Sequence, residues 1–93
     1  MIIKPSTRAG KRFMVTFSNG KTVHFGAAGG RTYIDHGDEK KKNAYIARHG
    51  ASKRENWDDP YSAGSISRWL LWGKHKTLGE NHADFMRRFP GVN

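Results

Sequence analysis

The chain has 93 residues, a length that allows one domain with a single small core, and three Trp, five Phe and three Tyr must supply much of that core. It contains no cysteine, which excludes disulfides, thiolate zinc sites and cysteine nucleophiles and agrees with an intracellular origin. No stretch of the sequence is as long and apolar as a signal peptide or a membrane span. Seventeen Lys and Arg against eight Asp and Glu give a net charge of +9, which favours a polyanionic partner, most simply nucleic acid, although acidic protein surfaces would attract the same charge.

Residues 1–11 are basic and contain only Ile2 and Ile3 as neighbouring apolar residues. Terminal segments with so few apolar anchors are commonly disordered. We therefore predict a flexible basic arm at residues 1–11, ahead of one small domain at residues 12–93. Such an arm could lie along a phosphate backbone or along a partner protein.

The clearest local pattern is a β-hairpin in the sequence KRFMVTF, SNG, KTVHFG. A two-residue turn at Asn19 and Gly20 would set apolar residues against polar ones across the two strands. A three-residue loop that includes Ser18 and ends on a left-handed Gly20 restores apolar pairs, so we predict this loop. In this register Phe13 lies opposite Phe25 and Val15 opposite Val23, and the core face carries Phe13, Val15, Phe17, Val23 and Phe25.

The next segment, AAGGRTYIDHG, is rich in glycine and predicts a connection that turns the chain away from the sheet. It lacks the strand, GxxxxGK, helix pattern of a nucleotide-binding loop. Arg31 to Ile34 could add a short third strand beside the hairpin, or could remain part of the connection.

Residues 38–49, DEKKKNAYIARH, predict a helix. Acidic residues at its start and Arg48 and His49 at its end complement the helix dipole, and Gly50 is a natural stop. Lysines occupy all three positions 40–42, so the helix begins with a strongly positive surface. These lysines could contact phosphates or could simply be solvated.

The segment 62–73, SAGSISRWLLWG, predicts the central core helix. Ser62 or Ser65 is a candidate N-cap, and Gly73 is a candidate left-handed stop. Apolar side chains cover more than half of its circumference, so we expect both of its tryptophans to be buried. The alternative is that Trp72 stays exposed as a stacking platform.

Trp57 stands in the polar connection that precedes this helix. A tryptophan in such a position normally packs back on the core and anchors the loop. The alternative is that Trp57 stacks on a nucleic-acid base while Lys53 and Arg54 hold the flanking phosphates.

Residues 77–89 predict a last, amphipathic helix that closes the core. Thr77 and Glu80 form a Thr-x-x-Glu capping box, and Pro90 stops the helix. The apolar face consists of Leu78, His82, Phe85 and Phe89, with Met86 beside it.

The sequence offers little support for an enzyme. No two of the five histidines lie four apart on a predicted helix, as a metal-binding pair would, and AGSISR lacks the final glycine of a nucleophile elbow. Carboxylates at a helix start explain Asp38 and Glu39 without a metal. We therefore expect no enzymatic activity, metal or other cofactor, although the densest group of possible ligands is Asp35, His36, Asp38 and Glu39.

The basic clusters, with Trp57, are the candidate nucleic-acid site. Contacts from such clusters go to phosphates, and no predicted helix carries the row of Arg, Asn or Gln that reading base edges requires. We therefore expect binding to the phosphate backbone without sequence specificity. The candidate residues are Lys40, Lys41, Lys42, Lys53, Arg54, Trp57, Arg68, Lys74, Lys76, Arg87 and Arg88.

The ordered blocks GKTVHFG, DEKKKNAYIARHG, KRENW and SRWLLWGK, roughly within residues 12–76, resemble a family of short basic proteins encoded by large nucleocytoplasmic DNA viruses. The resemblance carries no catalytic or binding residue over to this chain. It implies a place in the virus particle, and in the host cytoplasm or nucleus during infection. In that setting a small basic protein would bind the packaged DNA or, alternatively, act as a minor capsid or cement protein between larger shell proteins.

Taken together, these patterns predict an α+β fold in which the hairpin, with or without a third short strand, packs on three helices at 38–49, 62–73 and 77–89. The oligomeric state stays open. The predicted core comprises Phe13, Val15, Val23, Phe25, Tyr45, Ile46, Ile66, Trp69, Leu70, Phe85 and Phe89.

Overall fold

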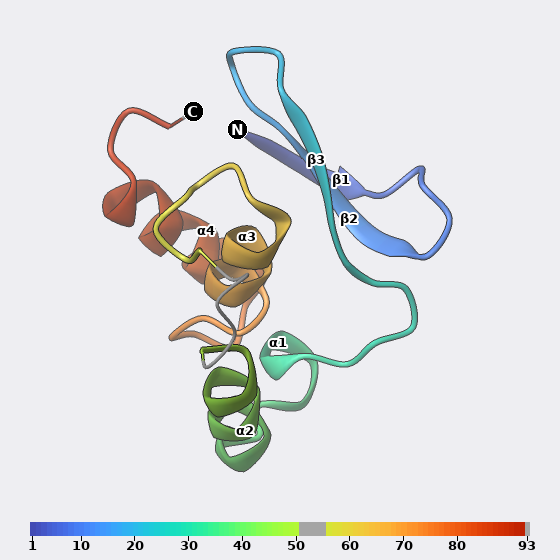
Figure 1. Ribbon diagram of the computed structural model, residues 1–93, viewed down its shortest axis with the longest axis vertical. Coiled ribbons are helices and arrows are strands. Elements are labelled where there is room, and N and C mark those ends of the chain that lie inside the picture. The colour runs from blue at the N-terminus through green and yellow to red at the C-terminus, as the bar shows by residue number, and fades with distance from the viewer. Residues whose placement is uncertain (51–55, 93) are drawn as a thin grey trace.

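A computed structural model describes residues 1–50 and 56–92 of the chain. It has the predicted α+β class, with a three-stranded antiparallel sheet at the N-terminus followed by helices (Figure 1). The elements are β1 (Ile2–Pro5), β2 (Lys11–Thr16), β3 (Thr22–Ala27), α1 (Tyr33–His36), α2 (Glu39–Gly50), α3 (Ala63–Leu70) and α4 (Leu78–Arg88).

The hairpin of β2 and β3 confirms the predicted register and loop. Phe13 lies opposite Phe25 and Val15 opposite Val23. Gly20 ends the loop with a φ of 87°, a left-handed conformation that a side chain would strain. The consequence is an apolar face that packs on the core, with Val15 and Phe25 completely buried.

Residues 2–5 correct the prediction of a flexible arm, because they form β1 at one edge of the sheet. β1 pairs with β2 so that Ile3 lies opposite Val15. Ile3 and Met1 are half-buried against the core, while Ile2 points to the solvent side and is 59% exposed. So short a strand is stable only when it pairs with a neighbouring strand, here β2. The sequence of residues 2–5 alone does not reveal that pairing.

The third strand is therefore β1, and the alternative placed at residues 31–34 is wrong. Thr32 instead caps the short helix α1. The Asp35 carboxylate accepts hydrogen bonds from the Thr32 backbone N–H at 2.8 Å and from the Thr32 hydroxyl at 3.0 Å. This Thr-x-x-Asp capping box favours a helical turn over a strand.

α3 is the central helix, as predicted, and Ser62 is its N-cap, accepting a hydrogen bond from the Ser65 N–H. It ends at Leu70, however, and Gly73 does not take the predicted left-handed conformation. Glycine is required at 73 for a different reason. A Cβ atom there would collide with the Trp69 carbonyl and would lie 2.7 Å from the Asn81 Oδ1.

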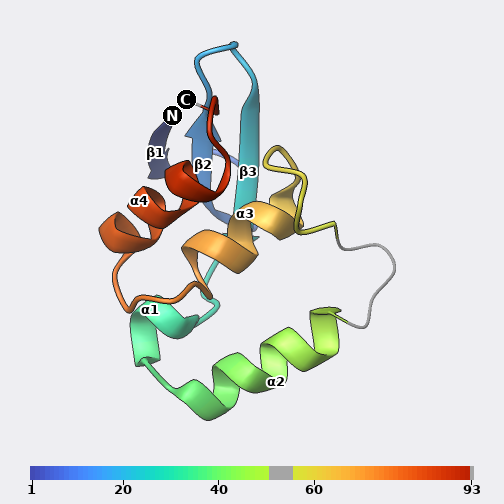
Figure 2. The same cartoon turned by 90° about the vertical axis from the view of Figure 1, so that its left-hand side faces the viewer.

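α4 lies beside α3, and Figure 2 shows both helices against one side of the sheet, with α2 set apart below them. Thr77 caps α4 by accepting a hydrogen bond from the Glu80 N–H. Phe85 is buried between the elements, and Val92 closes the core after the helix.

The buried core differs in part from the predicted one. Ile46, Trp69 and Phe89 are only half-buried, as are Phe13 and Val23. Phe17 is buried, as the hairpin register predicts, and Tyr33, Leu71 and Val92 are buried although the core prediction omitted them. Among the helices within residues 1–50 and 56–92, none is long and apolar enough to cross a membrane.

Candidate functional site

α2, α3 and α4 enclose a cleft of about 650 Å³ that we call the basic cleft. Five of its lining residues are cations, contributed by all three helices and by the loop between α3 and α4, and one is a carboxylate. The lining residues are Lys42, Arg68, Trp69, Lys74, Asp84, Phe85, Arg87 and Arg88.

Two arginines in the basic cleft lie over the ring of Trp69. The guanidinium carbon of Arg88 is 3.6 Å from the ring centroid, and that of Arg68 is 4.4 Å away. Such cation–π contacts hold a guanidinium without neutralising its charge. Within the described part of the chain, neither arginine forms an ion pair with a carboxylate.

Arg68 is the more enclosed of the two. Its Nη1 donates a hydrogen bond to the Trp72 carbonyl at 2.6 Å, while its buried Nε has no hydrogen-bond partner among the described residues. Burial lowers the pKa of Arg68, and the neighbouring positive charge of Arg88 acts in the same direction. Arginine nevertheless remains charged, so an anion in the cleft would relieve this crowding of positive charge.

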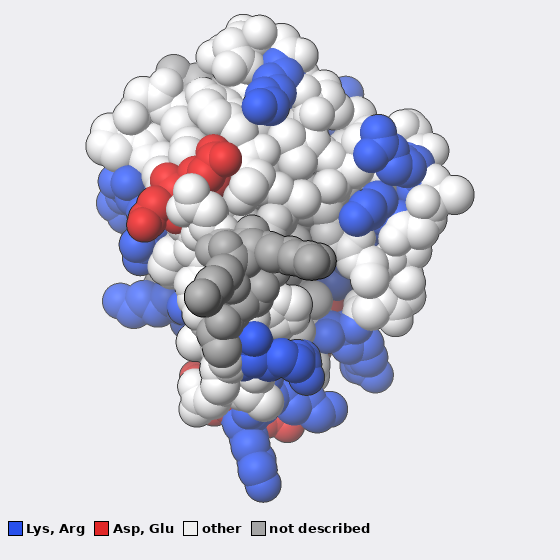
Figure 3. Space-filling view, in the orientation of Figure 1, with Lys and Arg blue, Asp and Glu red and all other residues white. Residues whose placement is uncertain are grey.

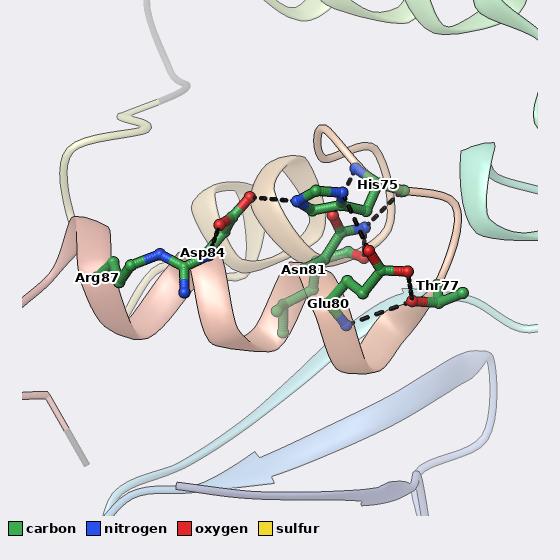
Figure 4. Close-up of polar contacts among 7 residues, drawn as sticks. His75, Thr77, Glu80, Asn81, Asp84 and Arg87 are labelled. Atoms are coloured by element: carbon green, nitrogen blue, oxygen red, sulfur yellow. Dashed lines mark hydrogen bonds and ion pairs between the residues drawn. The ribbon is translucent and has the colours of Figure 1, made fainter.

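The single carboxylate of the cleft, Asp84, is already engaged. It accepts a hydrogen bond from Arg87, and its Oδ2 lies 2.9 Å from the Nε2 of His75 (Figure 4). The hydrogen bond from Arg87, followed by the charges of Arg87 and His75, holds the pKa of Asp84 below its usual value. The Nδ1 of His75 in turn faces Glu80 at 3.3 Å.

Asn81 positions the loop that carries Lys74 and His75. Its side chain is fully buried, and its Nδ2 donates hydrogen bonds to the carbonyls of Leu70 and His75, both at 2.9 Å. Its Oδ1 accepts from the His75 N–H at 2.8 Å. The sequence prediction missed Asn81, although its place three residues after Leu78 on the apolar face of the helix was a signal.

The predicted binding residues fall into three groups. The first group lies outside the basic cleft and consists of Lys40, Lys41, Lys76 and Trp57. The three lysines are exposed, and Trp57 is half-buried with its ring edge-on to that of Trp69, at a centroid distance of 6.4 Å. Lys53 and Arg54 lie outside the described residues. Those that the fold brings to the basic cleft are Lys42, Arg68, Lys74, Arg87 and Arg88.

The tryptophans are occupied by contacts within the chain. Trp72 is half-buried, and its ring stacks on Tyr45 at a centroid distance of 4.4 Å and an interplanar angle of 5°. His36 contacts the same ring at 5.5 Å. The Trp57 carbonyl accepts hydrogen bonds from the Trp69 Nε1 and the Ser65 hydroxyl, so the connection before α3 is anchored through its backbone rather than by the predicted packing of the Trp57 ring on the core.

The carboxylates near α1 that could bind a metal accept hydrogen bonds from protein groups instead. Arg12 donates two hydrogen bonds to Asp35, at 2.6 and 2.7 Å, and Tyr33 donates one to Glu39. Asp38 caps the start of α2. In residues 1–50 and 56–92, no three His, Asp or Glu side chains converge as they would around a metal ion.

The surface charge is uneven. Lys and Arg side chains stand out at the lower end of the molecule, along its left-hand edge and on its right-hand side, while the largest acidic patch lies at the upper left (Figure 3). On α2, Lys42 lines the basic cleft, and Lys40 and Lys41 of the same helix are exposed.

Comparison with known proteins identifies one family. A family model described as "Family of unknown function (DUF5754)" matches residues 1–49, which include the sheet, α1 and nearly all of α2. No curated protein and no solved structure matches the chain. Because the family model covers more than half of the 93 residues, the chain belongs to DUF5754, a family of unknown function.

Proposed function

We propose that this protein binds nucleic acid, most directly DNA, through the phosphate backbone, without sequence specificity and without enzymatic activity. One observation carries the proposal: five cations from three helices and a loop line one cleft whose only carboxylate is already paired. Clustered cations that release counterions on contact with phosphates provide the binding free energy of most non-specific complexes.

The geometry of the arginines supports phosphate as the ligand. A guanidinium presents several donors in a plane that matches two phosphate oxygens. Arg88 is pre-oriented on the ring of Trp69, so its ordering costs little conformational entropy when an anion binds. Lys40 and Lys41 extend the positive surface beyond the cleft.

The state of the aromatic side chains supports a backbone-directed mode. Binding of single strands without sequence preference commonly relies on free aromatic faces on which bases stack. Here Trp72 is stacked on Tyr45, and Trp69 is covered by guanidinium groups. We therefore propose duplex DNA as the preferred form.

The resemblance to virus-encoded proteins extends the proposal to its setting. A basic protein that binds DNA without reading its sequence would suit a packaged genome. A place in the virus particle is part of the proposal, and its support is the sequence resemblance alone.

Fluorescence anisotropy with two labelled duplexes of unrelated sequence, across a salt series, tests the proposal. We expect equal affinities and a logarithm of the binding constant that falls steeply with the logarithm of salt concentration. Arg88→Gln and Lys74→Gln should each reduce the slope by about one and weaken binding to both duplexes alike.

Lys4→Gln and Arg8→Gln are the matched controls, because both residues are exposed and belong to the sheet end of the molecule. They should change affinity less than the cleft variants do. Absence of DNA binding at low salt would overturn the proposal. Equal losses of affinity in all four variants would show that binding depends on net charge alone and not on the basic cleft.

The alternative, a minor capsid or cement protein, has one structural feature in its favour. β1 pairs with β2 on one side only, and Ile2 beside this free edge is 59% exposed. An edge strand with an exposed apolar side chain can add to the sheet of another protein. Ile2→Lys would then abolish binding to capsid proteins and leave DNA binding unchanged.

A further inference from the structure

A second cleft, of about 430 Å³, is formed by the glycine-rich connection after β3, the end of α2 and the start of α3. We call it the connection cleft. It shares no lining residue with the basic cleft, so its properties can be tested separately.

Three cations from separate segments line the connection cleft: Lys11 from β2, Arg31 from the glycine-rich connection, and Arg48 from α2. No carboxylate is among the lining residues. In the described part of the chain, none of the three cations forms an ion pair. Three cations without a carboxylate partner among residues 1–50 and 56–92, around one small cleft, favour a compact ligand with more than one negative charge.

The start of α3 adds a second source of positive potential. Ala63 and Gly64, the first two residues of the helix, line the same cleft. Amides in the first turn of a helix lack acceptors within the helix, and the helix dipole favours an anion there. Gly64 has no side chain to keep a ligand away from these amides.

The rest of the lining is mixed: Thr32 and His49 are polar, while part of the wall is apolar. Leu71 and Trp72 line it, and Ser67 supplies a hydroxyl group. An inorganic anion alone would leave this apolar surface unused. A ligand with a doubly charged head and a small ring-containing body would contact both parts, and the cleft volume lies in the range of small-molecule sites.

We propose that the connection cleft binds a phosphate monoester attached to a nucleoside, with the phosphate between Arg31, Arg48 and the start of α3. Such a group has two sources, the 5′-terminal phosphate of a nucleic acid strand and a free nucleoside monophosphate. The site is independent of backbone binding in the basic cleft, because internal phosphates carry one charge and are diesters without a free end.

Titration of the full-length protein with adenosine 5′-monophosphate and with adenosine, followed by backbone amide chemical shifts, tests the site. We expect saturable shifts at residues 26–32 and 63–67 with the monophosphate, and binding of adenosine weaker by about tenfold or more. The double variant R31Q/R48Q should weaken binding of the monophosphate by at least the same factor. K4Q/R8Q, which removes two exposed cations outside both clefts, is the matched control and should leave it unchanged.

A short duplex with 5′-phosphates and the same duplex with 5′-hydroxyls distinguish the two sources. A preference for phosphorylated ends that R31Q/R48Q removes would identify nucleic acid ends as the ligand. Binding of the monophosphate without such a preference would identify the free nucleotide. The proposal is wrong if adenosine and its monophosphate bind with equal affinity. It is also wrong if R31Q/R48Q weakens binding of neither the monophosphate nor the phosphorylated duplex end. Both outcomes are independent of whether the basic cleft binds the phosphate backbone.

Discussion

At the scale of single residues, two polar side chains hold segments that the apolar core does not reach. Asn81 is completely buried and satisfies three backbone groups, the carbonyl of Leu70 at the end of α3 and the N–H and carbonyl of His75 in the loop that follows. Asp35 joins the sheet to α1, because it accepts hydrogen bonds from both Arg12 and Thr32. In both cases at least one hydrogen-bond partner lies in another segment of the chain, so an apolar pattern within one segment does not identify it.

Replacement of Asn81 by leucine should lower the free energy of unfolding by about 2–4 kcal/mol, because three backbone groups lose their partner in a buried site. Urea denaturation measures this loss. Asn43→Leu, at an exposed position of α2, is the matched control and should change stability by less than about 0.5 kcal/mol. Equal losses in the two variants would contradict the clamping role of Asn81.

Asp35 should make stability depend on pH. Hydrogen bonds from Arg12 hold the pKa of Asp35 well below its ordinary value of 3.8, so the folded state favours the carboxylate. This stabilisation is complete above the ordinary pKa and is lost as the pH falls from there toward the folded-state pKa.

Comparison of urea unfolding at pH about 6 and pH about 2 for the wild type and Asp35→Asn tests this dependence. The wild type should lose about 1–2 kcal/mol more than the variant, an amount reduced by partial solvent screening of the pair. Asp58→Asn, in an exposed loop, should instead follow the wild type. Parallel loss in the wild type and Asp35→Asn would refute the role of the Arg12 pair.

At the scale of elements, α2 is attached differently from α3 and α4. Tyr45 is its only buried residue, and it stacks on Trp72. Near the start of the helix, Glu39 accepts a hydrogen bond from Tyr33, and the Lys42 ammonium lies 4.5 Å from the Tyr33 ring centroid. α2 therefore rests on a few aromatic contacts, and it forms a wall of both clefts.

Tyr45→Ala should release α2 without unfolding the rest of the domain, because the core under α3 does not include Tyr45. Hydrogen exchange should show loss of amide protection at residues 39–50, with protection in β2 and α3 retained. Tyr45→Phe keeps the stacking ring and should preserve most of the protection in α2. Simultaneous loss of protection in all elements would show that α2 belongs to the cooperative core.

At the scale of the whole molecule, the net charge of +9 on 93 residues opposes the compact state. Repulsion between the cations is limited because most of them lie at the surface, where solvent screens their charge. Several also form cation–π contacts with aromatic rings. A bound polyanion would relieve the repulsion, so the same charge that favours the proposed partner lowers the stability of the free protein.

The free protein should become more stable with moderate salt, the opposite of the expected effect on DNA binding. An increase from about 0.01 M to about 0.15 M shortens the screening length from about 30 Å to about 8 Å, so we expect the thermal midpoint to rise. Differential scanning calorimetry measures it. K40Q/K41Q removes two positive charges and should reduce the rise, whereas an unchanged or lower midpoint in the wild type would show that repulsion does not limit stability.

The sequence alone determined the elements whose causes lie within a few residues. The hairpin register follows from alternating apolar residues around Gly20, and the start of α4 follows from Thr77. For α3 the sequence narrows the N-cap to Ser62 or Ser65, and the structure has Ser62. Each depends on local backbone preferences and hydrogen bonds between neighbours in the chain. The candidates predicted from the sequence include all five cations of the basic cleft. They could be named in advance because the excess of positive charge is visible in the composition.

Only the tertiary structure decided which distant residues meet. The sequence pattern predicts Ile3 in an arm, whereas in the fold Ile3 pairs with Val15 of β2, and Asn81 acts as a clamp only through the loop that it holds. Likewise, Lys42 and Arg88 are 46 positions apart in the chain, and the arrangement of α2, α3 and α4 brings both of them to one cleft. Contacts of this kind depend on how elements pack together, and packing is set by the whole core rather than by any segment of it.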